Sequence, residues 1–145
     1  MWNYSFISEV TIARPARDIW PYLFGKKNAA WSRTAYTIVA GEEGKVGYTY
    51  SMASFGESQL YFETIRAKPE KEMVLKILWK DNPKSEPRLA GYDFFTLTEQ
   101  AGRTKVLFLQ GFELPVEPQS EKHDEFLAEI LQNLKRMVEQ ADATE

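Results

Sequence analysis

The chain has 145 residues, with 18 basic and 21 acidic side chains, a formal net charge of -3 and no cysteine. This length fits one domain over residues 1–145 with a single core, and the lack of cysteine excludes disulfides, thiolate nucleophiles and zinc–thiolate sites. The small acidic excess, without any basic block, argues against a surface that binds nucleic-acid phosphates, so no nucleic-acid partner is expected.

The N-terminal end does not resemble a targeting segment. Its first ten residues lack a basic stretch followed by an apolar core and a small-residue cleavage site. No run approaches the ~20 consecutive apolar residues that a membrane-spanning helix needs. We therefore expect a cytoplasmic protein without a membrane span.

A strand and a short broken helix are predicted first. Residues 3–14 alternate apolar and polar side chains, which is typical of a half-buried strand. Pro15 suits the first turn of a helix, and the apolar spacing predicts that helix over residues 15–24. Pro21 lies deeper, where it removes a backbone hydrogen bond, so the helix is expected to be cut short, with the break at residues 25–28.

Repeated strands separated by turn signals follow between residues 31 and 112, the pattern of an antiparallel meander. Strands with one apolar side are expected to bury that side only. In the second of these strands, that side is formed by Val46, Tyr48, Tyr50 and Met52. The six predicted strands cover residues 35–40, 45–54, 57–67, 72–81, 89–99 and 104–113.

A long amphipathic helix is predicted from Ser120, which suits the N-cap position, to about residue 141. Its apolar residues project within about 140° of the helix wheel, so one face is expected to be buried along its whole length. These residues are Phe126, Leu127, Ile130, Leu131, Leu134, Met137 and Val138.

Several segments, taken in their order, resemble the START-like superfamily, also called SRPBCC, in its polyketide cyclase and chaperone-ATPase-activator-like branch. The resemblance covers essentially the whole chain. Its segments are IARPARDIWPYL at 12–23, Trp31, GKVGYTY at 44–50, TIRAKPEKEMVLKILW at 64–79 and AGRTKVLF at 101–108.

The resemblance implies an α+β helix-grip fold. In this fold a seven-stranded antiparallel curved sheet wraps around a long C-terminal helix, with a short broken helix pair after the first strand. It also implies an internal cavity whose contents vary across the superfamily from lipids and polyketides to nothing known, so the fold alone does not name a function.

Motifs for cofactors and metals are weak. GEEGKVG at 41–47 resembles a phosphate loop but lacks its glycine spacing and the Ser or Thr after Lys45, so a turn between strands is expected. His123, the only histidine, falls among acidic residues in the first turn of the last helix and is expected to be solvated. No metal site and no cofactor are predicted.

Carboxylates inside a cavity could act as general acids or bases. Glu9 and Glu63 oppose the apolar sides of their strands, so solvent exposure is expected for both. The inner face of residues 89–99 cannot be assigned, because apolar residues occur on both sides, and the position of Asp93 is left open. Glu57 and Asp81 are two further acids in predicted strands.

The aromatic share, 14% of the residues, is high. It favours a cavity for a small hydrophobic or aromatic molecule between the sheet and the last helix, with Tyr48 and Tyr50 as polar contacts. A volume of several hundred Å³ is expected. The predicted cavity residues are Tyr48, Tyr50, Phe62, Leu75, Trp79, Phe95, Phe108, Leu127, Leu131 and Leu134.

Two alternatives remain open. A cyclase- or aromatase-like enzyme would use the same cavity and would need an acid or base inside it, for which Tyr48, Tyr50, Asp93 and Arg33 are the candidates. A protein-interaction module like the chaperone activators would have a solid core and a large exposed apolar patch. The ligand, any catalysed reaction and a homodimer are left undecided by the sequence.

Overall fold

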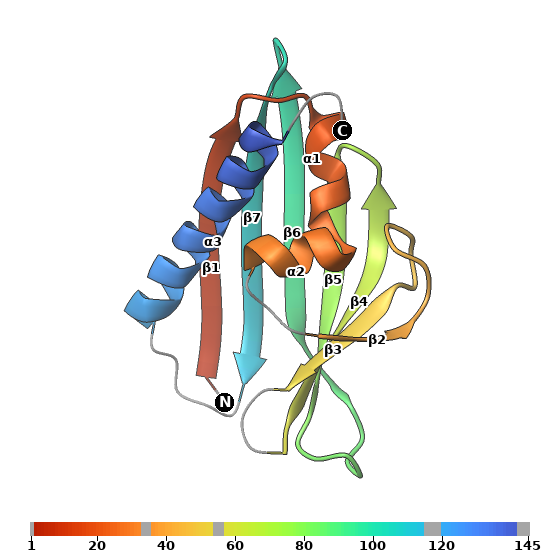
Figure 1. Cartoon of the computed structure of the whole chain (residues 1–145). Helices are drawn as coiled ribbons and strands as arrows, with labels where there is room; N and C mark the ends of the chain where they lie inside the picture. Colours follow the sequence, from red (N-terminus) through yellow and green to blue (C-terminus); the bar gives the residue numbers. More distant parts are fainter. Residues whose placement is uncertain (1, 33–35, 54–56, 115–119, 142–145) are drawn as a thin grey trace.

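The computed structural model describes residues 2–32, 36–53, 57–114 and 120–141, apart from the side chains of Trp2, Ala53, Leu114 and residues 120–123. Its seven strands form one antiparallel sheet in the order β1-β7-β6-β5-β4-β3-β2 (Figure 1). The strands are β1 Trp2–Ile12, β2 Thr37–Ala40, β3 Thr49–Ala53, β4 Gln59–Lys68, β5 Glu72–Lys80, β6 Arg88–Gln100 and β7 Arg103–Leu114.

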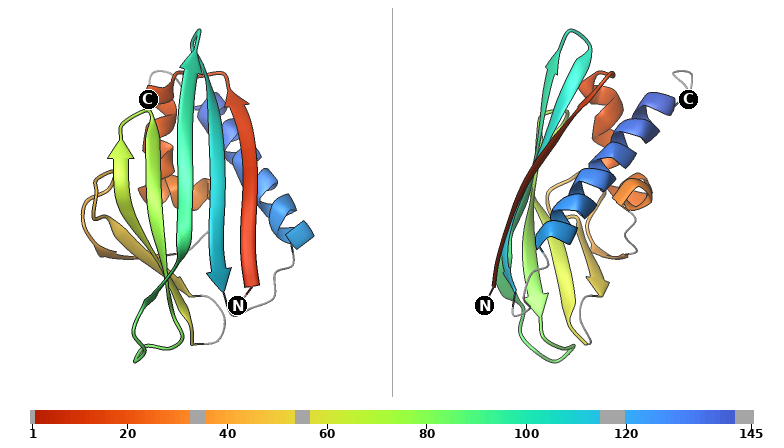
Figure 2. Two further views of the ribbon diagram at one scale, coloured as in Figure 1. Left: turned by 180° about the vertical axis from the view of Figure 1, so that it is seen from behind. Right: turned by 90° about the vertical axis from the view of Figure 1, so that its left-hand side faces the viewer.

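The helices all lie on one face of the curved sheet, and the other face is open (Figure 2). The long helix α3 crosses the sheet over β1 and β7, and the shorter helices lie over β5 and β6 (Figure 1). This arrangement is the helix-grip fold expected from the sequence. The helices are α1 Ala16–Ile19, the 3-10 helix η1 Trp20–Leu23, α2 Gly25–Ser32 and α3 Ser120–Gln140.

The broken helix after β1 is confirmed. Pro15 caps α1 in an extended conformation, and the Ala16 N–H donates to Glu99 Oε1 at 2.7 Å, so a residue of β6 holds the start of the helix. Pro21 lies in η1, where the α-helical hydrogen bonding has ended. The prediction of a break over residues 25–28 was wrong, because Gly25 with φ of 70° turns the chain directly into α2.

The strand predicted over residues 45–54 is shorter in the structure. Only Thr49–Ala53 forms β3, and the Val46 side chain is 64% exposed. Gly44 and Gly47 have positive φ values of 76° and 97°, which fold the preceding residues into turns instead of an extended strand. Val46 therefore does not share the inner face with Tyr50 and Met52.

The inner face of β6 is now assigned. Asp93, Phe95 and Leu97 are buried beneath the helices, whereas Phe94 between them is 40% exposed on the open face. Glu9 is exposed, as expected, and its carboxylate pairs with Lys105 Nζ at 3.1 Å. Glu63 is half-buried, so the expected full exposure holds for Glu9 alone.

The apolar face of α3 is buried over most of its length but not at its beginning. Leu131, Leu134 and Val138 are each at most 1% exposed, whereas Phe126 is 40% exposed. Asn133 is also buried, and its Nδ2 donates to the Trp31 carbonyl at 3.4 Å. This polar contact joins α3 to the end of α2 and was not expected from the apolar pattern.

The C-terminal half of α3 is fastened to the end of β1. Lys135 Nζ donates to the Thr11 carbonyl at 2.5 Å, and the Ala13 N–H donates to Glu139 Oε2 at 2.7 Å. Arg14 Nη2 donates to the Glu139 carbonyl at 2.9 Å, near the helix end where carbonyls lack helical partners. The Ala13 N–H and then Lys135 lower the pKa of the Glu139 carboxyl.

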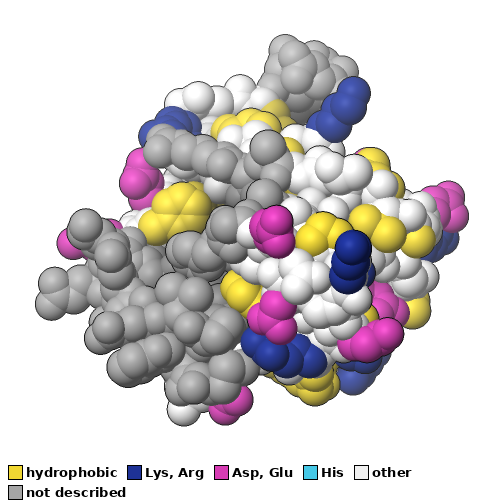
Figure 3. All heavy atoms as spheres, turned by 90° about the horizontal axis from the view of Figure 1, so that it is seen from below, with side chains coloured by type: hydrophobic (Ala, Val, Ile, Leu, Met, Phe, Trp, Pro, Cys, Tyr) yellow, Lys and Arg dark blue, Asp and Glu magenta, His cyan; other side chains and the backbone are white. Residues whose placement is uncertain are grey.

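The open face of the sheet carries a row of exposed apolar side chains. Ile7 pairs with Leu109, and Leu109 pairs with Phe94 on the next strand. Their side chains are 69%, 38% and 40% exposed, respectively. On the face of the molecule seen from below, hydrophobic side chains come to the described surface in separate patches between charged ones (Figure 3).

Gly91 and Gly111 offer a test of how closely β6 and β7 pack. A Cβ at Gly91 would overlap the carbonyl oxygen of Gly111 and lie 2.5 Å from the Cα of Phe112, whereas a Cβ at Gly111 would meet nothing within 4 Å. We expect Gly91→Ala to lower the free energy of unfolding by about 1–3 kcal/mol, as in other overpacked sites. Urea denaturation measures this loss.

The matched control is Gly111→Ala, which adds the same methyl group on the adjacent strand. We expect it to leave stability unchanged or to raise it by up to about 1 kcal/mol, because alanine loses less backbone entropy than glycine on folding. Equal losses in the two variants would contradict the close approach at Gly91.

Candidate functional site

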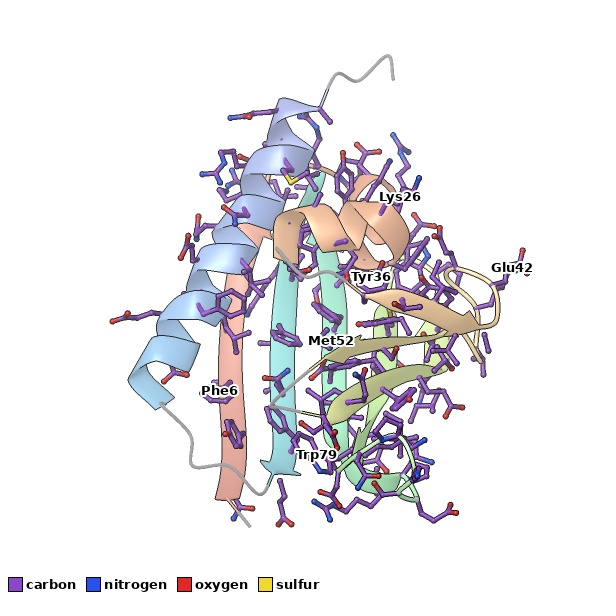
Figure 4. The ribbon with its side chains drawn as sticks, turned by 60° about the horizontal axis from the view of Figure 1, so that its bottom comes forward. Phe6, Lys26, Tyr36, Glu42, Met52 and Trp79 are labelled. Atoms are coloured by element: carbon purple, nitrogen blue, oxygen red, sulfur yellow. The ribbon has the colours of Figure 1, made fainter. Side chains whose placement is uncertain are left out.

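A cavity of about 200 Å³ lies between the inner face of the sheet, α2 and the first half of α3. It is smaller than the several hundred Å³ expected from the sequence. Figure 4 looks toward it from below, with Met52 of β3 pointing into the interior and Tyr36 near the beginning of α2. Met52, Tyr50 and Leu60 are half-buried and Phe126 is 40% exposed, so several residues of the cavity wall also reach the molecular surface.

Each layer of the fold contributes part of the wall. Strand alternation puts every second residue of β5, β6 and β7 on the inner face, and the helical spacing of α3 turns Phe126, Leu127 and Ile130 toward the same space. Helix α2 adds Asn28, Trp31 and Ser32, and η1 adds Leu23. The residues from the sheet are Tyr50, Met52, Leu60, Phe62, Leu75, Ile77, Asp93, Phe95, Phe108, Gln110 and Phe112.

Aromatic rings form much of this wall in stacked pairs. The rings of Tyr50 and Phe62 lie 5.1 Å apart with an interplanar angle of 13°, and those of Phe95 and Phe108 lie 4.5 Å apart at 17°. Trp31 meets Phe95 edge to face at 6.4 Å, and its Nε1 donates to the Tyr22 carbonyl at 2.5 Å. These contacts fix the rings before any ligand arrives.

One carboxylate faces this aromatic space. Asp93 is 5% exposed, and its Oδ1 accepts a hydrogen bond from Gln110 Nε2 at 2.8 Å. Burial raises the pKa of Asp93 from 3.8 to about 7, and the Gln110 hydrogen bond opposes part of this shift. Near neutral pH the group is therefore divided between its two protonation states, as a general acid or base requires.

A cluster of three phenols approaches Asp93 through one of its members, Tyr50. The Tyr36 ring lies 4.4 Å from that of Tyr50, and the Tyr48 ring lies 6.1 Å from it. The Tyr36 hydroxyl donates to the Gly25 carbonyl. Burial, with the charge of Asp93 as the next cause, raises the pKa of Tyr50 well above 10, so this phenol stays neutral at physiological pH.

The structure brings six of the predicted cavity residues together in the wall: Tyr50, Phe62, Leu75, Phe95, Phe108 and Leu127. The other four are buried outside it. Tyr48 is 2% exposed, with its ring 6.1 Å from that of Tyr50, and Trp79 donates from Nε1 to Asp81 Oδ1 at 2.7 Å. Leu131 and Leu134 belong to the solid part of the core under α3.

Sequence reasoning missed Gln110, Asn28 and Ser32. A signal for Gln110 was present, because the two-residue turn at Ala101 and Gly102, both with positive φ, sets the register of the β6–β7 hairpin. That register places Gln110 directly opposite Asp93. No comparable signal marked Asn28 and Ser32, because Asn28 fell in the expected break over residues 25–28 and Ser32 fell outside every predicted helix and strand.

Three further predictions fall outside what the structure describes: the Arg33 candidate, the Ser120 cap and the solvated His123. Among the described residues, no group of three or more His, Asp or Glu side chains is placed to hold a metal ion. Within the same ranges, no helix combines the length and apolar content needed to cross a bilayer.

Comparisons with known proteins support the fold. No family model and no curated protein sequence matches the chain. Among solved structures, the Aha1 dimer from Colwellia psychrerythraea matches with a TM-score of 0.71 and 18% identity over 94% of this chain and 97% of the other. An uncharacterized protein from Rhizobium leguminosarum matches with a TM-score of 0.70 and 12% identity over 96% of each chain.

A third structure is larger. DynU16, from the dynemicin biosynthetic locus, matches with a TM-score of 0.67 and 12% identity over 94% of this chain and 47% of its own, so the present chain spans about half its length. At these identities the comparisons show the fold alone. The chain has the START-like helix-grip fold that its motifs predicted.

Asp93 makes stability depend on pH. Because the folded-state pKa is raised, the proton binds more tightly to the folded than to the unfolded chain, and the resulting stabilisation is lost as pH rises from about 4 to about 7. At about 1.4 kcal/mol per pKa unit, the whole change is on the order of 4 kcal/mol. We expect Asp93→Asn, which removes the titration, to be a few kcal/mol more stable than the wild type at pH 8.

Urea unfolding of both proteins at pH 4 and pH 8 measures this difference. At pH 4 the wild-type side chain is protonated in the folded state, so the two stabilities are expected to be close. A difference between variant and wild type that is the same at both pH values would show that the Asp93 pKa is not raised.

Proposed function

We propose that this protein binds a small hydrophobic or aromatic molecule in the cavity between the curved sheet, α2 and the first half of α3. The supporting observation is the combination of fixed aromatic walls with one polar pair, the buried Asp93 and the half-buried Gln110. Binding pockets for small molecules commonly have this composition, in which apolar area favours binding and a few polar groups set the orientation.

The size of the cavity limits the ligand. An apolar cavity of about 150 Å³ in another protein holds one benzene molecule. A cavity of about 200 Å³ therefore has room for one ring with a short substituent. Met52 and Phe126 are among the wall residues that reach the surface, and a larger ligand would have to displace such residues.

An enzyme of the cyclase or aromatase kind is the second candidate. Asp93 supplies the internal acid or base that this alternative needs, with a pKa raised to about 7. The origin of DynU16 in a biosynthetic locus is compatible with it. Turnover that is lost in Asp93→Asn while ligand binding persists would distinguish an enzyme from a binding protein.

The interaction-module alternative has less support. It expects a solid core, whereas the interior contains a cavity. It also expects a large exposed apolar patch, and the face in Figure 3 shows separate patches. The row of Ile7, Leu109 and Phe94 is the observation that favours it. The Aha1 structure is that of a dimer, which allows a homodimer here as well.

Toluene tests the proposed cavity directly, because it is apolar and has the size of one substituted ring. We expect a toluene titration followed by methyl NMR to shift the resonances of Leu60, Leu75 and Ile77 in the wall. The exposed methyl groups of Ile7 and Leu89 serve as internal controls and are expected not to move. Shifts of equal size at all these positions would contradict a specific cavity.

A variant that fills the cavity completes the test. Met52→Trp adds bulk to the wall and is expected to abolish the toluene shifts, because no room for a ring remains. Ile38→Trp adds similar bulk on the exposed strand β2 and is expected to leave toluene binding unchanged. Undiminished binding to folded Met52→Trp would overturn the proposed location.

A further inference from the structure

As far as the structure describes it, the cavity wall carries a negative charge without a positive one, and this imbalance indicates the charge of the ligand. Among its described residues, Asp93 is the one charged side chain, and no lysine, arginine or histidine joins it there. Among the described residues, its carboxylate accepts a hydrogen bond from the neutral amide of Gln110, although a carboxylate can accept about four. Buried charges in proteins are normally paired with an opposite charge. The described residues of this wall supply no such cation for the Asp93 carboxylate.

We propose that the ligand supplies this cation: it is a small aromatic or aliphatic amine whose ammonium group pairs with the Asp93 carboxylate beside Gln110. This inference rests on the proposed binding function and specifies the class of ligand. An ammonium group donates up to three hydrogen bonds, and in a space shielded from water a charge-assisted bond is stronger than a neutral one.

The aromatic wall favours the same charge. Gln110 lies between Phe108 and Phe112 on β7, and Asp93 lies two residues before Phe95 on β6. Alternate residues of a strand face the same side, so the carboxylate is surrounded by rings. The face of an aromatic ring attracts cations, whereas an anion near it gains no such attraction.

Other ligand charges fit the site less well. A carboxylate ligand would place a second negative charge beside Asp93 in a poorly solvated space, where like charges disfavour each other. A neutral alcohol can donate one hydrogen bond to Asp93 but leaves its charge unpaired. The expected order of affinity at pH 8 is therefore amine, then alcohol, then carboxylate.

The titratable groups around Asp93 do not compete with this pairing. The Tyr50 phenol of β3 interacts with Asp93 from across the curved sheet, and Tyr36 and Tyr48 lie next to Tyr50. Of the two strands adjacent to β6, β7 presents the neutral amide of Gln110 and β5 presents Leu75. Burial raises the pKa of all three phenols, so they stay neutral at pH 8. A bound ammonium is expected to keep Asp93 ionised and to lower its pKa.

The experiment compares 2-phenylethylamine, 2-phenylethanol and phenylacetate, which share one ring and differ in charge. Each is titrated into the full-length protein at pH 8, with binding followed through the methyl resonances of the cavity wall. We expect the amine to bind about tenfold or more tightly than the alcohol, as a hydrogen bond to a charged group allows. Phenylacetate is expected to bind more weakly than both.

Asp93→Asn is the decisive variant, because the amide keeps the shape and the contact to Gln110 but carries no charge. We expect its affinities for amine and alcohol to agree within about threefold. Glu9→Gln removes a negative charge from the exposed pair with Lys105, on the other face of the sheet, and is expected to keep the wild-type preference for the amine. In the wild-type protein, carbon NMR of the Asp93 carboxyl measures its pKa with and without the amine, and we expect this pKa to fall when the amine binds.

The outcomes separate this inference from the proposed function. Equal binding of amine and alcohol to the wild type, or an amine preference that persists in Asp93→Asn, would overturn the amine inference and leave the cavity-binding function intact. Failure of all three compounds and of toluene to shift the wall resonances of the folded wild type would overturn both.

Discussion

The attachment of α3 to the end of β1 is the contact on which the rest of the architecture depends. Three hydrogen-bond donors form this attachment. The Ala13 amide and the Arg14 guanidinium follow the end of β1, and the Lys135 ammonium belongs to the last two turns of α3. Arg14 satisfies backbone carbonyls at the helix terminus, Lys135 satisfies the Thr11 carbonyl of the strand, and the Ala13 amide binds the Glu139 carboxylate. Together these bonds fix the position of the helix along the sheet. Because this attachment is at the C-terminal end, the first half of the helix is left to face the cavity.

The core is therefore divided into a solid part and a hollow part. Under the second half of α3, Ile12, Val106 and Leu134 have no exposed surface and pack as a normal protein interior. Under the first half, the same sheet presents stacked rings and the Asp93–Gln110 pair around a space of about 200 Å³. Leu131 and Leu134 lie on the solid side of this division, which is why their apolar character did not make them wall residues.

Periodicity predicted the elements well and predicted the wall less well. Strand alternation and the Pro15–Pro21 segment were sufficient for the order of strands and helices, because those signals are local. Asp93 could not be assigned from β6 alone, since Phe94 and Phe95 give both faces an aromatic residue. Its side of the sheet depends on pairing with β5 and β7, which is a tertiary constraint. The prediction for Val46 was wrong for a local reason. The alternation of apolar and polar residues looked continuous from residue 45, but Gly44 and Gly47 have positive φ values and keep the chain around Val46 out of the strand.

The position of Asp93 is difficult to explain by stability alone. A leucine or asparagine could occupy the centre of the inner face without the cost of burying a charge, and that cost grows as pH rises toward neutrality. Residues that oppose folding are more often found where a protein binds or reacts than in the packed core. The surrounding rings are already fixed by stacking and by the Trp31 hydrogen bond, so the space around the carboxylate does not have to form when a ligand enters. A rigid aromatic space with one acid, and with no cation among the described residues of its wall, is suited to recognising a ligand by its charge as well as by its shape.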